Sequence, residues 1–375
     1  MNMFTKFLFA VVILFFQPSL GFKIRERPCI KSIFSFGDSI ADTGNLMREG
    51  ASGPFSTIAN LPYGETTFNK STGRCSDGLL MIDYLALALD LPLVTPFLDK
   101  NGDFKYGVNF AVAGATVLDK SFFDNQHITN LFTSSSLNVQ LRWFKSHLNS
   151  TCFSRAERAK KLTQSLIMMG EIGGNDYNYA FLAGKTIPQL EDYVPYVVQT
   201  IVNATKEVID LGAAQVVVPG NFPIGCMPIY LTAFGSKNQE DYDENNCLKD
   251  LNAFSLFHNA KLQEALGDLR KTYPYVHIKY ADYYRAFMYL IENASALGFD
   301  ESSLLKACCG SGGEYNFDVK KQCGFPGVST CKDPATHISW DGIHMTQKAY
   351  EIMATTLIRA FNYPHYGFQE KWKCF

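Results

Sequence analysis

Five short apolar runs alternate along this chain with longer segments whose apolar residues recur at helical spacing. The runs are predicted strands over residues 32–36, 108–112, 165–169, 215–218 and 276–280. The predicted helices cover residues 77–89, 137–148, 193–211, 252–271 and 345–361. Because parallel neighbours need crossover connections, this alternation predicts an α/β fold with a mostly parallel five-stranded sheet, covered by helices on both faces.

No linker interrupts the pattern. The 375-residue chain contains no proline-rich or serine-rich stretch, charge block or internal repeat. Its hydrophobic fraction of 47% is ample for a packed core. We therefore expect a single domain over residues 22–375, preceded by a signal peptide at residues 1–21.

The amino terminus carries the features of a secretory signal. Lys6 precedes an apolar run over residues 7–16, and the small residues Ser19 and Gly21 follow it. The run is shorter than the roughly 20 residues that a membrane-spanning helix needs, so we expect cleavage near Gly21 and no membrane span afterwards. The net charge of −2, without basic runs, predicts no nucleic-acid or anionic-lipid partner.

The cysteine content fits an oxidising compartment. An even number of cysteines, ten, lies beyond the predicted cleavage site, which suggests disulfides whose pairing the sequence leaves open. A metal site is the alternative, but no Cys-x-x-Cys pair occurs and the histidines are scattered, so we expect no metal. Glycosylation sequons support the same compartment and lie at Asn69, Asn149, Asn203 and Asn293.

Four segments far apart in the chain together contain the groups that acyl-transfer chemistry needs. They are FGDSIADTGN at 36–45, GVNFAVAGAT at 107–116, GGNDYN at 173–178 and SWDGIHMT at 339–346. Each of the first three segments lies at the carboxyl end of a predicted strand or directly after it. In parallel sheets, ligands bind beyond the carboxyl ends of the strands. Their joint presence indicates a hydrolase.

Ser39, His344 and Asp341 are the candidate catalytic residues. Serine is a weak nucleophile that needs an adjacent base, and His344 could take its proton. Asp341, three residues earlier, could hold the imidazole in the correct tautomer. His337 is a rival base without an acid at that spacing, whereas His258, in an apolar helix, is expected in the core.

Each segment also has an alternative interpretation as ordinary structure. Gly-Asp-Ser readily forms a turn, and Asp42 to Asn45 would then be surface or capping residues. Asp341 would cap a helix and His344 would lie on the surface.

The negative charge of a tetrahedral intermediate requires hydrogen-bond donors. We predict an oxyanion hole formed by the backbone N–H groups of Ser39 and Gly114 and the side-chain amide of Asn175. The alternative is that the glycines and Asn175 serve tight turns.

These four segments resemble the plant GDSL esterase/lipase family of the SGNH hydrolase superfamily. Its name-giving Ser, Gly, Asn and His match Ser39, Gly114, Asn175 and His344, and Asp341 matches its aspartate. The similarity extends over VVVPGNFPIGCMP at 216–228 and CCGSGGEYN at 308–316. The resemblance implies a three-layer, flavodoxin-like α/β/α sandwich and ester hydrolysis without a metal or organic cofactor. The chain departs from the motif at Ile40, where leucine is usual, an exchange of equal size.

RCSDGLLMIDYLALAL at 74–89 and GVNFAVAGATVLDKSF at 107–122 resemble the branch that contains sinapine esterase and acetylajmalan esterase. This resemblance implies a small-molecule partner, an acetyl, methyl or hydroxycinnamoyl ester of a specialised metabolite, with alkaloid esters among them. An acyltransferase with the same acyl-enzyme and a non-catalytic binding glycoprotein are the alternatives. We expect a monomer that is secreted to the apoplast or resides in the vacuole or ER lumen.

Overall fold

The computed structural model describes residues 29–50 and 53–362. Its centre is a five-stranded sheet in the order β2-β1-β3-β4-β5, in which every neighbouring pair is parallel. The strands are β1 (Ser32–Ser35), β2 (Gly107–Asn109), β3 (Ser165–Met168), β4 (Gln215–Pro219) and β5 (His277–Ala281). The five predicted strands and their parallel arrangement are therefore confirmed.

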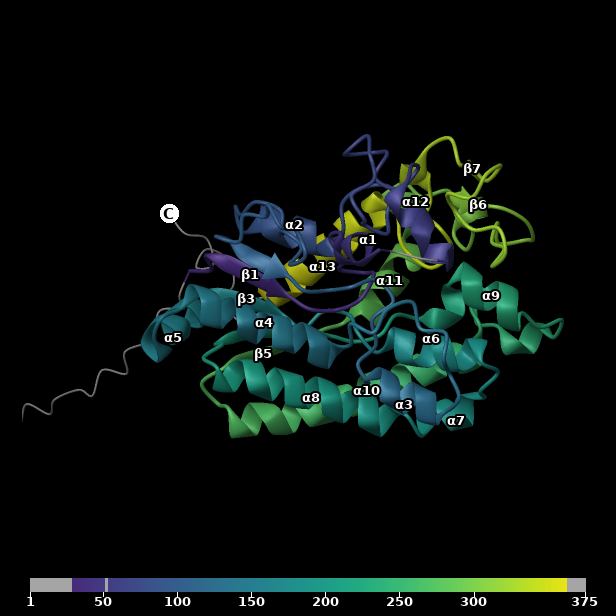
Figure 1. Ribbon diagram of the computed structural model, residues 1–375. Coiled ribbons are helices and arrows are strands. Elements are labelled where there is room, and N and C mark those ends of the chain that lie inside the picture. The colour runs from purple at the N-terminus through teal and green to yellow at the C-terminus, as the bar shows by residue number, and fades with distance from the viewer. Residues whose placement is uncertain (1–28, 51–52, 363–375) are drawn as a thin grey trace, which may run out of the picture.

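Helices cover both faces of this sheet, which gives the three layers visible in Figure 1. One face carries α2 (Met81–Ala88) and α13 (Gln347–Asn362), with α11 (Tyr283–Glu292) packed on α13. The opposite face carries α4 (Leu137–Thr151), α8 (Val194–Asp210) and α10 (Lys249–Thr272). The five predicted helices are all present, and α11 is an addition.

Shorter elements complete the described part of the chain. The remaining α-helices are α1 (Asn45–Glu49), α3 (Lys120–Asn125), α5 (Arg155–Thr163), α6 (Gly174–Leu182), α7 (Ile187–Glu191), α9 (Pro228–Phe234) and α12 (Ala294–Leu297). The 3₁₀ helices are η1 (Gly53–Ala59), η2 (Ile224–Cys226), η3 (Gln239–Asp241), η4 (Glu301–Ser303) and η5 (Pro334–Thr336). A two-stranded antiparallel pair joins β6 (Cys309–Gly310) to β7 (Ser329–Thr330).

The helix predicted from residue 77 begins only at Met81, because polar contacts hold the preceding residues in a loop. The Asp77 carboxylate accepts from the backbone N–H of Gln347 at 2.6 Å and from the Thr66 hydroxyl at 2.5 Å. The Asp83 carboxylate then accepts from the N–H of Leu80 at 2.9 Å, which caps the helix. Asp77 thereby joins this loop to the start of α13.

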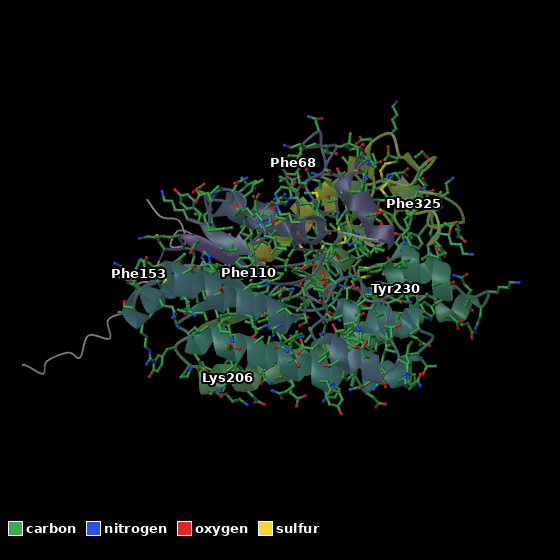
Figure 2. All side chains as sticks on the ribbon, in the orientation of Figure 1. Phe68, Phe110, Phe153, Lys206, Tyr230 and Phe325 are labelled. Carbon is green, nitrogen blue, oxygen red and sulfur yellow. A yellow bond between two sulfur atoms is a disulfide. The ribbon has the colours of Figure 1, made fainter. Side chains whose placement is uncertain are left out.

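Aromatic side chains fill the space between the sheet and α4. Phe110 lies inside the molecule (Figure 2), and its ring centroid is 5.8 Å from that of Phe144 on α4. Phe34 and Phe36 of the first strand region pack on the same Phe144 ring at 5.3 and 5.4 Å. All four rings are fully buried, so they contribute a large apolar area to the core.

Three disulfides link pairs of cysteines that both lie in the described part of the chain, Cys226–Cys247, Cys308–Cys331 and Cys309–Cys323. Cys308 and Cys331 lie near His337, but their shared disulfide leaves no thiolate for a metal there. The backbone N–H groups of Cys308 and Cys309 donate to the carbonyls of Ser339 and Trp340 at 3.0 and 2.7 Å. The disulfide-linked segment therefore supports the loop that carries Asp341 and His344.

The predicted signal peptide lies outside the described residues. Within the part of the chain that is described, no helix is long and apolar enough to cross a bilayer. Of the sequon asparagines, Asn69, Asn149 and Asn203 are exposed and Asn293 is half-buried.

Replacing Cys309 and Cys323 together by serine is expected to lower the thermal unfolding temperature. The bridge joins cysteines with a sequence separation of 14 residues. Its removal should lower the free energy of unfolding by roughly 2–4 kcal/mol. Thermal melts without reductant measure the effect. Cys152→Ala, at a buried free thiol, is the control, and unchanged melting of the double variant would contradict the expectation.

Candidate active site

The structure brings Ser39, His344 and Asp341 into one hydrogen-bonded series. The Ser39 Oγ lies 2.8 Å from His344 Nε2, although the two residues are 305 positions apart. His344 Nδ1 lies 2.7 Å from Asp341 Oδ2. The other oxygen, Oδ1 of Asp341, accepts from the N–H groups of Ile343 and His344, so the carboxylate is held from both sides.

Buried contacts hold the turn that carries Ser39. Gly37 has a φ of +135°, and a Cβ there would meet the backbone oxygen of Glu171 at 2.9 Å, so only glycine fits without strain. The Gln140 side chain on α4 accepts from the N–H of Gly37 at 2.9 Å and donates to its carbonyl at 2.8 Å. The nucleophile candidate is thus anchored to the helical layer beneath the sheet.

Asp42 joins the first two sequence segments. Its carboxylate accepts from the N–H groups of Gly44, Asn45 and Leu46 and, at 2.8 Å, from the N–H of Ala113. The alternative of surface positions for Asp42 to Asn45 was wrong, because all of these residues are buried.

Asp176, in the third segment, binds the residues that directly follow the second segment. Its carboxylate, on α6, accepts from the N–H groups of Val117 and Leu118 at 2.8 and 2.9 Å. Burial raises the pKa of Asp176 to about 7, although these two hydrogen bonds favour its charged form.

The predicted oxyanion donors lie beside the same turn. Among the described residues, the backbone N–H groups of Ser39 and Gly114 donate to no protein acceptor. Gly114 has a φ of +80°, and a Cβ there would come within 3.0 Å of the Tyr179 hydroxyl. The Nδ2 atom of Asn175 lies 3.1 Å from Asp38 Oδ2 and 3.0 Å from the Ala115 carbonyl, so an additional acceptor would share one of its hydrogens.

A cavity of about 340 Å³ opens next to Ser39 and Asn175. Tyr230, labelled on α9 in Figure 2, is one of its walls. Its aromatic lining consists of Phe55, Phe132, Tyr179, Phe181, Phe222, Tyr230 and Phe234. Among the described residues that line it, Asp38 and Glu171 carry the carboxyl groups. Such a mainly apolar cavity with few polar groups suits a small organic ligand.

Two side chains behind the series were not predicted. The Tyr63 hydroxyl donates to Asp341 Oδ2 at 2.9 Å, across 278 positions of sequence. Burial, together with the Asp341 charge, raises the pKa of Tyr63 well above its usual range, so the hydroxyl stays a donor. The buried thiol of Cys75 contacts His344, and burial raises the pKa of this thiol. No local sequence pattern marks either residue for such a place.

The Asp341 carboxylate controls the titration of His344. Burial alone would lower the pKa of the imidazole, but the charges and hydrogen bonds of Asp341 and of the adjacent Cys75 together outweigh it and raise the pKa well above 6.5. Burial correspondingly opposes ionisation of Asp341, yet the His344 charge and the hydrogen bonds hold its pKa below the usual value.

The other two histidines considered from the sequence have different partners. His337 Nδ1 lies 3.0 Å from the Thr336 hydroxyl, and burial lowers its pKa. His258 is fully buried on α10, as expected for a core residue, and its Nδ1 lies 2.8 Å from the Tyr177 hydroxyl. Neither histidine bonds to Ser39.

A serine, an imidazole and a carboxylate in hydrogen-bonded series, at the carboxyl edge of a parallel sheet, are typical of serine hydrolases. The sequence model of the GDSL-like lipase/acylhydrolase family matches residues 33–357. The chain belongs to this family and is a carboxylic ester hydrolase.

Plant relatives match most of the chain. An acetylajmalan esterase of Rauvolfia serpentina is 46% identical over 327 residues, which cover 87% of this chain and 84% of the relative. A GDSL esterase/lipase of Arabidopsis thaliana is 47% identical over 346 residues, covering 92% and 85%. A second Arabidopsis GDSL esterase/lipase is 46% identical over 353 residues, covering 91% and 94%. The resemblance drawn from the motifs is confirmed.

Asp42→Ala is expected to destabilise the fold strongly, because it leaves several backbone N–H groups buried without an acceptor. The loss of unfolding free energy should be roughly 3–5 kcal/mol. Urea denaturation measures it, with Asp268→Ala at an exposed ion pair as the control that changes little. Equal midpoints for the two variants would show that the Asp42 hydrogen bonds are not stabilising.

Proposed function

We propose that this protein is a serine esterase that hydrolyses carboxylic esters of small specialised metabolites through an acyl-enzyme on Ser39. The observation that carries the proposal is the 2.8 Å contact between Ser39 Oγ and His344 Nε2, with Asp341 2.7 Å behind the imidazole. The pair lies beside an aromatic cavity that can hold the ester.

In the first half of the reaction, Ser39 Oγ attacks the ester carbonyl while His344 Nε2 takes its proton. The neutral imidazole accepts at Nε2 because its Nδ1–H donates to Asp341, which sets the tautomer. The carboxylate then stabilises the imidazolium. Tyr63 donates to the same carboxylate oxygen and keeps it turned toward the ring.

The negative charge that develops on the carbonyl oxygen is held by the N–H groups of Ser39 and Gly114 and by Asn175 Nδ2. Neither backbone donor has an acceptor among the described residues, so both can bind this oxygen. His344 next protonates the leaving alcohol, and a water molecule activated by the same imidazole releases the acid from Ser39.

The cavity supports a compact substrate. Its volume of about 340 Å³ lies at the lower end of ordinary small-molecule sites. The name of the acetylajmalan esterase relative also favours a small ester. We propose acetyl, methyl or hydroxycinnamoyl esters as substrates, with alkaloid esters among them.

We place the protein in the secretory pathway, as a single-domain monomer with an amino-terminal signal peptide and glycans at the sequons. The disulfides support an oxidising compartment such as the apoplast, the vacuole or the ER lumen.

Ser39→Ala is expected to abolish labelling by a fluorophosphonate and to lower kcat at least about 10⁴-fold, because no other group replaces the nucleophile. The measurement is hydrolysis of acetyl, methyl and hydroxycinnamoyl esters beside gel detection of the label. Ser302→Ala, at an exposed serine, is the control. Persistent labelling of Ser39→Ala would remove Ser39 from the reaction.

The pH profile of kcat/KM should rise through a midpoint above 6.5, because the base must be neutral and Asp341 raises the pKa of His344. Asp341→Asn removes that charge, so the midpoint of the residual activity should move to lower pH as kcat falls. Initial rates from pH 5 to 10 measure both effects. An unchanged midpoint would show that Asp341 does not raise the pKa of the catalytic base.

A further inference from the structure

We infer that Glu171 is a positioning residue: it donates a hydrogen bond to Asp38, and Asp38 holds the Asn175 amide with Nδ2 toward the reaction centre. The inference rests on the proposed function, since it assumes that Asn175 is an oxyanion donor. Neither carboxyl group has a part in the proton transfers between Ser39, His344 and Asp341.

Glu171 lies between β3 and α6, directly against the residues it is inferred to position. Its backbone carbonyl accepts from the N–H of Asp38 at 3.2 Å, and its side chain hydrogen-bonds the Asp38 carboxyl group. A Cβ on Gly174, the residue before Asn175, would come within 3.1 Å of Glu171 Oε1. Glu171 is only 5% exposed, and it is one of the residues that line the cavity.

The neighbours of Asn175 define which end of its amide faces Ser39. Asp38 Oδ2 and the Ala115 carbonyl only accept, so the group between them is the Nδ2 donor. On the other side, Asn178 Nδ2 lies 3.3 Å from Asn175 Oδ1, and the Tyr230 hydroxyl donates to Asn178 Oδ1. A reversed Asn175 would present an oxygen to the developing oxyanion and repel it.

The proton held by Glu171 keeps Asp38 an acceptor. Burial raises the pKa of Glu171 well above its usual range, and the neighbouring Asp38 charge raises it further. Burial raises the pKa of Asp38 only to about 6, because bonds from Glu171 and from the N–H of Ile40 favour its ionised form. Both directions favour a proton on Glu171 that is donated to an ionised Asp38. Were the proton on Asp38, that side chain could donate to Oδ1 of a reversed Asn175.

A double-mutant cycle on hydrolysis of p-nitrophenyl acetate tests this chain of contacts. Asn175→Ala alone should lower kcat roughly 10²–10³-fold, the usual effect of deleting an oxyanion donor. Glu171→Met, which keeps the chain length but cannot donate, should lower kcat about 10–100-fold, with KM changed less than threefold. In the Asn175→Ala background, Glu171→Met should have no further effect, because its action passes through Asn175.

Glu171→Gln is the matched rescue variant, since its amide still donates to Asp38. Its kcat should stay within threefold of the wild-type value. If Glu171 had only a steric or stabilising role, Glu171→Gln and Glu171→Met would instead have the same kcat. Thermal melts show that each variant is folded. Should Glu171→Met not fold, Asp38→Leu replaces it, with the same expected loss in kcat and the same absence of an effect in the Asn175→Ala background.

The two proposals fail in different ways. An unchanged kcat in Asn175→Ala would refute the oxyanion role and, with it, the positioning role. If Asn175→Ala lowers kcat as expected but Glu171→Met lowers kcat further in the Asn175→Ala background, only the positioning role of Glu171 is overturned. A Glu171→Gln loss as large as that of Glu171→Met would also overturn it.

Discussion

The hydrogen bond between Ser39 and His344 requires two loops from opposite ends of the chain to be held to within 2.8 Å. Neither loop could keep that position alone. The first is anchored to α4 through Gln140, and the second is braced by backbone bonds to the disulfide-linked segment. These supports make the contact part of the folded core instead of an occasional encounter between mobile groups.

Buried carboxylates join the other segments around the site. Asp42 binds the second segment and Asp176 binds the residues directly after it, and each accepts from backbone N–H groups that would otherwise lack a partner. Burial of charge is unfavourable unless hydrogen bonds compensate it, so these residues stabilise one loop arrangement and penalise others. Asp38 and Glu171 are two further buried carboxyl groups at the cavity, and in the inferred arrangement the proton on Glu171 keeps Asp38 an acceptor.

Regular elements were predictable because their signals are local. The apolar runs of β1, β3 and β4 and the helical spacing in α8 and α10 can be recognised within about twenty residues. The start of α2 could not be predicted, because Asp77 forms hydrogen bonds with Thr66 and with Gln347, which is distant in sequence. The helix α11 was missed although Asp282, which caps it by accepting from Arg285 N–H, is a recognisable signal.

The sequence by itself determined the sheet, the layers and the identity of the four segments, including Ser39, Gly114, Asn175, Asp341 and His344 as candidates. Tertiary structure alone decided the parts that depend on distance: the hydroxyl of Tyr63 on Asp341, the amide of Gln140 on Gly37, and the place of Glu171 beside Asp38. The reason is physical. Periodicity records which face of an element is buried, whereas a hydrogen bond between residues far apart in the chain leaves no mark in the residues that flank either partner.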